Sequence, residues 1–323
     1  MSERGPSYWV HQFGRNELPV LSRTVEELER LRADPDNLTP QRISAVVLHD
    51  PLMTFKVLRY IQERRHRSQM VDITTISHAL MMVGTDPFML QFTRQQTLQS
   101  WLAQDRDSLA GALAVISRAR HAAMFAKDWA LIRHDIEVDE VIIAALLHDL
   151  SELLLWCWAP RLSRLIEKLK RDSGMRSEAA QRAILGFPLI ALQMELAREW
   201  QLPRLLCGLM DVRHAASPRG LNVSLAVAVA RHSANGWGDA ALPDDFEAIG
   251  KLLGMSALQA RQRVVHAATR VAEEDEWYGL PPQTVAGPGE ADGGEPERAD
   301  GPEPRRGDPE PERARDPQPG EAP

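Results

Sequence analysis

The feature that most constrains the fold is a long apolar stretch with a few polar residues at its centre. Residues 141–147 read Val-Ile-Ile-Ala-Ala-Leu-Leu, the centre carries His148, Asp149, Ser151 and Glu152, and residues 153–158 are again apolar. The stretch is long enough to resemble a membrane span, but each ionisable group at its centre would cost about 2.5–3.5 kcal/mol in a bilayer. We therefore expect two consecutive core helices here, and no membrane anchor.

Helical spacing of apolar residues recurs along most of the chain, for example at the Leu, Phe, Val, Leu and Ile residues of segment 52–61. The apolar–polar alternation of a half-buried strand does not persist anywhere. Helix starts are indicated by Thr39 before Pro40, and by Thr24 with Glu27, the pattern of a capping box. These signals predict an all-α fold.

Composition divides the chain into three parts. Residues 1–17 are polar, and we expect a loosely ordered N-terminal segment. Residues 18–280 carry the helical patterns and are expected to form one domain with an N-terminal half, 18–105, and a second half, 106–280. Residues 281–323 include eleven prolines and seven glycines. This segment has too few apolar side chains for their burial to offset the loss of chain entropy on folding, so we expect a disordered C-terminal tail.

Charge and cysteine content exclude several classes of protein. The net charge is −7, but the tail carries −6 of it, which leaves residues 1–280 near −1. Nucleic-acid-binding proteins usually present a basic face, so no nucleic-acid partner is expected. Cys157 and Cys207 lie in apolar helical sequence without a CxxC partner, as free thiols in a reducing compartment do. With no signal-peptide pattern at the N-terminus, a cytoplasmic protein is predicted.

The dipeptides His49-Asp50 and His148-Asp149 stand in different contexts. His49-Asp50 is followed by Pro51, which makes Asp50 a helix N-cap whose carboxylate is occupied by backbone donors. His148-Asp149 follows an apolar helix, and His121 lies 27 residues upstream, about one helix and a loop away. Imidazole and carboxylate groups together suit a transition-metal ion. His121, His148 and Asp149 are therefore candidate metal ligands, with a hydrogen-bonded core histidine as the alternative for His121.

Short motifs follow one another in a distinctive order over residues 18–275. They are Leu18-Pro19, Asp50-Pro51 with Leu58-Arg59, Ile76 with Ala79 and Val83-Gly84, Leu146-Leu147-His148-Asp149, and Trp200-Gln201-Leu202-Pro203. In order and spacing they resemble the HDOD domain, the regulatory offshoot of the HD superfamily of metal-dependent phosphohydrolases. The resemblance implies an all-helical, HD/HDOD-like domain with a non-catalytic role in signalling or regulation. One departure is Gln62, where these domains usually carry an asparagine.

The resemblance also implies which residues a working hydrolase would need. HD hydrolases hold metal with an upstream histidine, the His-Asp pair and a distal aspartate. His121, His148 and Asp149 match the first three positions, but Arg231 stands where the distal aspartate belongs. An arginine cannot ligate a cation and repels one. It can instead pair with Asp149 in the space that a metal would fill.

Two further positions bear on the site. Glu152 stands in the run after Asp149 where the hydrolases tend to carry a Gly-Lys pair, and a glutamate opposes phosphate binding. His214 lies where metal-richer relatives place paired histidines, and is a weaker candidate ligand. These departures favour a degenerate site. We therefore expect no cofactor, and a bound divalent metal is the weaker alternative.

The sequence therefore predicts a non-catalytic HDOD-like signalling or regulatory protein that uses a degenerate HD core as a scaffold or ligand sensor. Protein partners in a signalling pathway are expected, with a small nucleotide as a candidate ligand. The alternative is a metal-dependent phosphohydrolase acting on nucleotides or cyclic nucleotides. A third interpretation is an adaptor whose acidic, proline-rich tail recruits partners.

Overall fold

The computed structural model of the chain describes residues 4–64, 73–211 and 217–281. Within these ranges the regular secondary structure is helical, apart from one isolated parallel bridge between Val20 and Thr97. The prediction of an all-α fold is confirmed. The helices are α1 (Pro6–Gly14), α2 (Ser22–Arg32), the short 3₁₀ helix η1 (Pro35–Asn37), α3 (Pro40–Val47), α4 (Pro51–Arg64), α5 (Ile76–Val83), α6 (Thr85–Phe92), α7 (Leu98–Trp101), α8 (Arg106–Ile132), α9 (Val138–Leu147), α10 (Leu150–Trp158), α11 (Pro160–Ser173), α12 (Ser177–Leu185), α13 (Leu189–Glu199), α14 (Arg204–Met210), α15 (Pro218–Ser233), α16 (Leu242–Leu253) and α17 (Ala257–Trp277).

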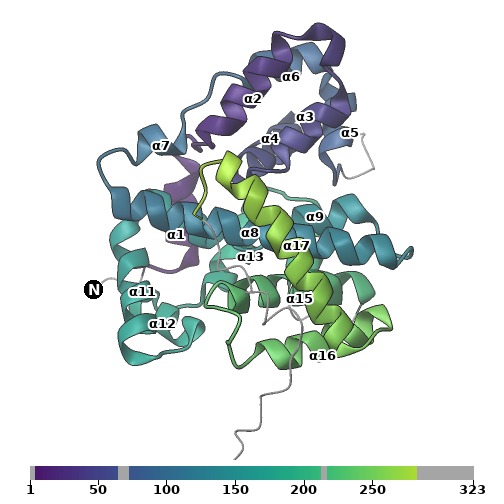
Figure 1. Cartoon of the computed structure of the whole chain (residues 1–323). Helices are drawn as coiled ribbons and strands as arrows, with labels where there is room; N and C mark the ends of the chain where they lie inside the picture. The colour runs from purple at the N-terminus through teal and green to yellow at the C-terminus, as the bar shows by residue number, and fades with distance from the viewer. Residues whose placement is uncertain (1–3, 65–72, 212–216, 282–323) are drawn as a thin grey trace, which may run out of the picture.

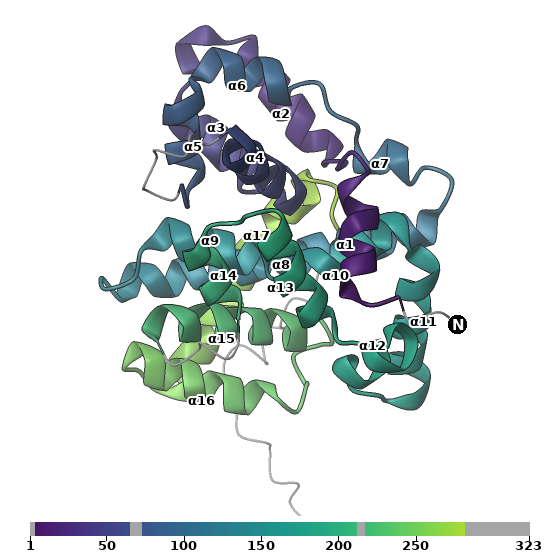
Figure 2. The ribbon, with the colours of Figure 1, turned by 180° about the vertical axis from the view of Figure 1, so that it is seen from behind.

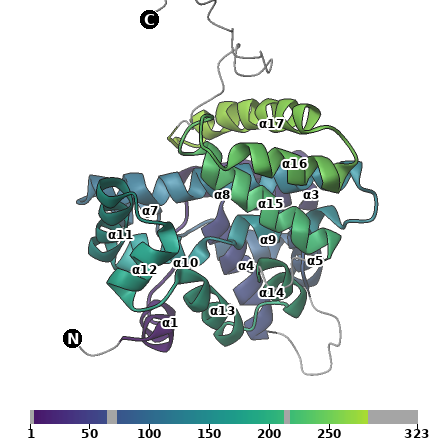
Figure 3. The same cartoon turned by 90° about the horizontal axis from the view of Figure 1, so that it is seen from below.

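The long helix α8 lies at the centre and contacts α9, α10, α15 and α17 (Figure 1). A helix surrounded by others must be apolar on several faces. Small side chains also let its neighbours approach closely. Many of the buried residues of α8 are alanines: Ala112, Ala119, Ala122, Ala123, Ala126 and Ala130. Figure 3 shows α15, α16 and α17 packed beside one another on one side of this centre.

The N-terminal helices α2 to α6 form a separate layer (Figures 1 and 2). Asp50, in front of α4, holds two helix starts of this layer. Its carboxylate accepts hydrogen bonds from the N–H groups of Leu52 (2.9 Å) and Met53 (3.1 Å), as predicted, and from Leu21 (2.7 Å). The capping box predicted at Thr24 is wrong: α2 begins at Ser22 without a side-chain cap, and the N–H of Ser22 donates to the side-chain oxygen of the distant Gln99 (2.9 Å).

The N-terminal segment is more ordered than its composition suggests. Residues 1–17 were expected to be loosely held, yet α1 forms here and buries Trp9, Val10 and Phe13. The ring of Phe13 packs 5.3 Å from that of Trp158, and α1 contacts α13. The physical reason lies in the segment itself: Pro6 occupies a first-turn position, and the three apolar residues share one helical face.

The last helix ties the N-terminal layer to the body of the protein. Ser256 and Gln259 form a capping box at the start of α17, and the helix then crosses α8 (Figure 1). At its far end Tyr278 stacks on His49 with ring centroids 4.8 Å apart, and Arg23 lies 3.9 Å over the ring of Trp277. The predicted disorder of the tail concerns residues that, from 282 onward, lie outside the described part of the chain.

Candidate functional site

The central apolar stretch is two helices, and the His-Asp pair is the joint between them. In the described residues one helical segment, Val138–Trp158, is long and apolar enough to cross a membrane, but 89% of its apolar window is buried inside the protein. The expected pair of core helices is thus confirmed. His148 ends α9, and Asp149 leaves helical geometry (φ −101°, ψ 22°) before α10 begins.

A buried glutamine from α13 braces this joint. Where one helix ends and another begins, backbone groups lose their intrahelical partners. The Gln193 side chain donates to the carbonyl of Leu147 (2.9 Å) and accepts from the N–H of Ser151 (2.7 Å). The Ser151 hydroxyl in turn donates to the carbonyl of Leu189 (3.2 Å). One side chain therefore satisfies both sides of the break, a role that the sequence did not reveal.

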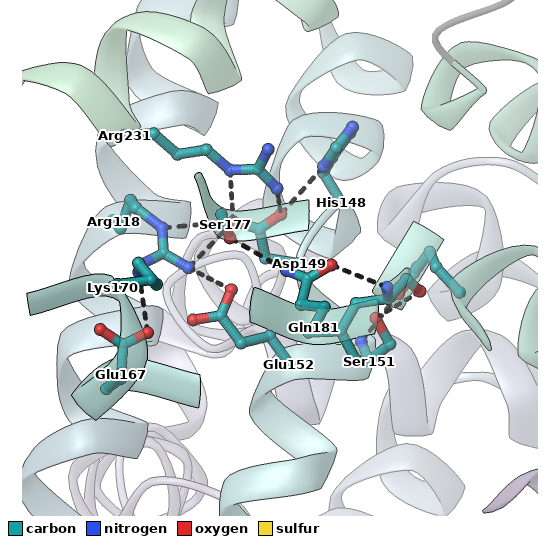
Figure 4. A network of polar contacts seen from close by, with 12 residues as sticks. Arg118, His148, Asp149, Ser151, Glu152, Glu167, Lys170, Ser177, Gln181 and Arg231 are labelled. Atoms are coloured by element: carbon teal, nitrogen blue, oxygen red, sulfur yellow. Dashed lines mark hydrogen bonds and ion pairs between the residues drawn. The ribbon is translucent and has the colours of Figure 1, made fainter. Parts of the chain in front are cut away.

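The carboxylate of Asp149 faces two arginines (Figure 4). Arg118, from α8, donates to Oδ2 from Nε (3.2 Å) and from a terminal nitrogen (3.1 Å). Arg231, from α15, donates from Nε to the same oxygen (3.3 Å) and also bonds Oδ1. His148 Nδ1 lies 3.0 Å from Oδ1. Both carboxylate oxygens are therefore occupied by cationic donors, and Arg231 makes the pairing with Asp149 that its position in the sequence suggested.

A second carboxylate balances the charge of this cluster, which we define as Arg118, Asp149, Glu152 and Arg231. Glu152 accepts a hydrogen bond from Arg118 at 2.7 Å (Figure 4), so it neutralises an arginine here. The cluster then contains two positive and two negative charges. Asp149 exposes 6% of its side chain and Arg118 16%, whereas Arg231 exposes 48%. Arg231 is therefore the solvent-facing member.

The charges of the cluster hold it in its ionised form. Burial alone would raise the pKa of the Asp149 carboxyl, but the positive charges of Arg231 and Arg118 hold it well below its usual range. Burial opposes the charge of Arg118 as well, yet Glu152 and Asp149 raise the pKa of its guanidinium. Neither group can change its charge near neutral pH, so the cluster acts there as a permanent set of ion pairs.

His121 lies in a different polar network, on the side of α8 that faces α17. Its Nδ1 is 3.0 Å from the carbonyl of Ser117 and 3.8 Å from the carboxylate of Asp275. Asp275 also accepts from the Ser117 hydroxyl (2.6 Å) and from Arg120. Burial lowers the pKa of the His121 imidazole, against the opposing charge of Asp275. Asp275 has no motif around it, and sequence reasoning missed it.

A metal ion does not fit the residues that were candidate ligands. Both oxygens of Asp149 are engaged by guanidinium groups, and Arg231 brings a positive charge to the position of the family's distal carboxylate. In residues 4–64, 73–211 and 217–281, no group of three or more His, Cys, Asp or Glu side chains is arranged to hold a metal. The structure joins His148 to Asp149 but places His121 with Asp275. His214 lies outside the described residues.

The family of the chain follows from a direct comparison. Residues 18–216 match the model of the HDOD domain, which is more than half of the chain. The protein therefore belongs to the HDOD domain family, and the resemblance found in its motifs is confirmed. No match was found among the curated proteins that were compared.

Solved structures share the fold. A virulence factor from Campylobacter jejuni subsp. jejuni is similar with a TM-score of 0.62 and 16% identity, over 85% of this chain and 98% of that chain. The MmoQ response regulator from Methylococcus capsulatus str. Bath is similar with a TM-score of 0.56 and 18% identity, over 77% of this chain and 98% of that chain. At these identities the likeness concerns the fold alone.

Proposed function

We propose that this HDOD protein is a non-catalytic signalling or regulatory protein, and that its HD-like core is a structural scaffold. The observation that carries the proposal is the pairing of Asp149 with both Arg118 and Arg231. Membership of the HDOD family supports a signalling role, and one protein of similar fold is named a response regulator. Protein partners in a signalling pathway and a cytoplasmic location belong to the same proposal.

Electrostatics explain why the cluster opposes catalysis. A hydrolase of the HD type uses its metal to activate water for attack on a phosphoester. A guanidinium about 4.5 Å from a divalent cation would repel it by roughly 7 kcal/mol at an effective dielectric constant near 20. The buried ion pairs thus take the place of a metal site.

The competing function is a metal-dependent phosphohydrolase acting on nucleotides or cyclic nucleotides. It requires that a metal displace Arg118 and Arg231 from Asp149. Direct measurement separates the two functions: the metal content of the purified full-length protein by mass spectrometry, and hydrolysis of nucleoside phosphates and cyclic nucleotides with added Mn²⁺. We expect little tightly bound transition metal and no hydrolysis. Stoichiometric metal, together with hydrolysis that is lost in Asp149→Ala, would establish the hydrolase instead.

A pair of variants tests the electrostatic reason itself. Arg231→Gln removes a positive charge without adding a carboxylate, and Arg231→Asp removes the charge and restores the carboxylate. If repulsion and the missing ligand both matter, Mn²⁺ affinity should rise from the natural protein to Arg231→Gln and again to Arg231→Asp. The remaining Arg118 should keep both affinities modest. Identical Mn²⁺ binding in all three proteins would contradict this account of the core.

A further inference from the structure

A groove with the size of a binding site lies between α1 and the joint of α10 and α11 (Figure 2). It has a volume of about 650 Å³, and ligand sites commonly have volumes of about 300–1,000 Å³. No residue of the ion-pair cluster lines it. The groove is therefore separate from the HD-like core, and its own lining determines what it can bind.

Aromatic rings pack one against the next along this groove. The ring of Trp9 lies 5.3 Å from that of Tyr8 and 5.9 Å from that of Phe13, measured between centroids. Phe13 in turn packs against Trp158. Tyr8 is 37% exposed, and Trp158 and Pro160 are half-buried, so part of this surface is open to solvent. Aromatic-lined grooves are the sites at which proline-rich segments dock in the polyproline II conformation.

The charge of the groove favours an acidic occupant. Arg4 and Arg161 line it and are exposed, and none of the described residues in its lining is acidic, which gives a net charge of +2. The guanidinium of Arg4 lies 4.9 Å from the centroid of the Tyr8 ring. Neither arginine takes part in an ion pair or a hydrogen bond among the described residues. Both positive charges are therefore available to carboxylates of a bound segment.

The chain's own tail contains a segment with both required properties. Residues 308–312 read Asp-Pro-Glu-Pro-Glu, so two prolines alternate with three carboxylates and the segment has a net charge of −3. Proline fixes φ near about −65°, and a segment restricted in this way loses less conformational freedom when it docks. Because every copy of the chain contains this segment, no further partner is needed to fill the groove.

The connection to this segment is long enough to reach the groove. The described part of the chain ends at residue 281, and residues 282–307 precede the segment. At about 3.1 Å per residue, a proline-rich connection of that length spans up to roughly 80 Å. A compact domain of about 280 residues has a radius of gyration of roughly 19 Å. The connection is about four times this radius, which allows the segment to pass around the body of the protein.

We propose that residues 308–312 dock in this groove of the same chain, with the two prolines against the aromatic rings and the carboxylates paired with Arg4 and Arg161. The tether makes docking intramolecular, so a weak intrinsic affinity is enough to keep the groove occupied. A partner that recognises the acidic, proline-rich segment has to compete with the groove for it.

This inference goes beyond the proposed function and holds or fails independently of it. The metal and hydrolysis measurements concern Asp149 and Arg231, whereas docking is tested through the groove and the tail. A hydrolase could dock its tail in this way, and a scaffold could lack the contact.

The test is photo-cross-linking in the full-length protein. The photoreactive residue p-benzoylphenylalanine replaces Gln12, which lines the groove, or Leu90 as a control, because Leu90 is 79% exposed on α6 and lies outside the groove. Mass spectrometry identifies the cross-linked peptides, and an equal mixture of ¹⁴N- and ¹⁵N-labelled protein distinguishes links within one chain from links between two copies. We expect links within one chain from position 12 to residues 308–312, and a yield at least fivefold lower from position 90.

Charge reversal on each side tests the pairing between groove and tail. A groove variant combines Arg4→Glu with Arg161→Glu, and a tail variant changes all three carboxylates of residues 308–312 to lysine. Each variant should lower the yield from position 12 at least fivefold, and combining the two should restore most of it. Arg171→Glu is the matched control, because Arg171 is an exposed arginine of α11 outside the groove, and it should leave the yield unchanged.

Three results would overturn the proposal. The first is an equal yield from positions 12 and 90, and the second is a yield that neither the groove variant nor the tail variant lowers. The third is cross-linking only between differently labelled chains, because it would identify the tail of a second copy as the occupant. The tail variant leaves residues 4–281 unchanged, so it decides the matter even if the groove variant does not fold.

Discussion

The dipeptides His49-Asp50 and His148-Asp149 each stand directly before a helix, and their two aspartates have different partners. Asp50, before α4, accepts from three backbone N–H groups. Asp149, before α10, makes no side-chain cap and instead accepts from two arginines. Burial raises the pKa of Asp50, whereas Arg231 and Arg118 overcome burial and lower that of Asp149. The direction of each pKa shift therefore depends on the groups around the carboxyl, and not on the dipeptide that contains it.

Replacing each aspartate with the neutral asparagine should produce the largest difference in stability between the two sites. Asp149→Asn leaves Arg118 buried with one carboxylate partner fewer, and breaking a buried pair in this way costs about 3–5 kcal/mol. Asp50→Asn keeps an oxygen for the start of α4, since asparagine caps helices as well as aspartate, and it loses mainly the bond from Leu21. We expect about 1–2 kcal/mol there. Urea unfolding measures both, and equal losses would remove the distinction.

The second largest difference in stability should be between variants of the two arginines that pair with Asp149. Arg118 is mostly buried between Asp149 and Glu152, whereas Arg231 is half exposed. Arg118→Gln should cost about 3 kcal/mol, and Arg231→Gln about 1 kcal/mol or less because water screens its charge. Both variants can be compared by the same unfolding measurement. A greater loss in Arg231→Gln would show that the solvent-facing arginine is the main partner of Asp149.

Replacing the histidines of the two dipeptides should have similar effects on stability. The ring of His49 bonds the carbonyl of Ala45 (2.5 Å) and Glu274 (3.3 Å) and stacks on Tyr278. His148 bonds Asp149 at 3.0 Å. We expect His49→Ala and His148→Ala each to cost about 1–2 kcal/mol. A loss in His148→Ala several times that in His49→Ala would contradict this expectation.

The contributions of the two aspartates to stability should depend on pH with opposite signs. Between pH 7 and pH 5 this is the smallest of the expected effects. The raised pKa of Asp50 means that the folded protein binds its proton more tightly than the unfolded chain. The natural protein should therefore gain stability relative to Asp50→Asn as the pH falls from 7 toward 4. The lowered pKa of Asp149 gives stability that is constant over that range and is lost only below about pH 4. Unfolding curves at several pH values measure both contributions. The same change of stability with pH at both aspartates would contradict this difference.

Much of the fold could be predicted because its signals are local. Pro40 after Thr39, the cap at Ser256 and the left-handed Gly84 each mark a helix end through their own chemistry, and the structure places helix ends at all three. The helix α1 had such signals too, in Pro6 and in the spacing of Trp9 and Phe13. Its polar composition concealed them.

The site was harder to predict because its partners are distant in sequence. The pairing of Arg231 with Asp149 could be anticipated, since a family pattern fixed the position of each. Gln193 and Asp275 carry no pattern of their own, and nothing local distinguishes them from exposed polar residues of a helix. His121 followed the family spacing but contacts Asp275. A spacing along two helices fixes which turns meet, but not the direction in which each ring points.

The attachment of α17 has a consequence for how the protein is made. The buried bonds of Asp275 to Ser117 and Arg120 join residues 158 and 155 positions apart, and the bond of Glu274 to His49 spans 225. On the ribosome the first half of the chain therefore emerges long before the carboxylates that complete it. Until α17 is synthesised, Arg120 has no acidic partner from that helix, and the face of α8 that packs against α17 is uncovered. Nascent chains halted before residue 257 should consequently be the species that chaperones bind and proteases remove, because such exposed apolar surface favours aggregation.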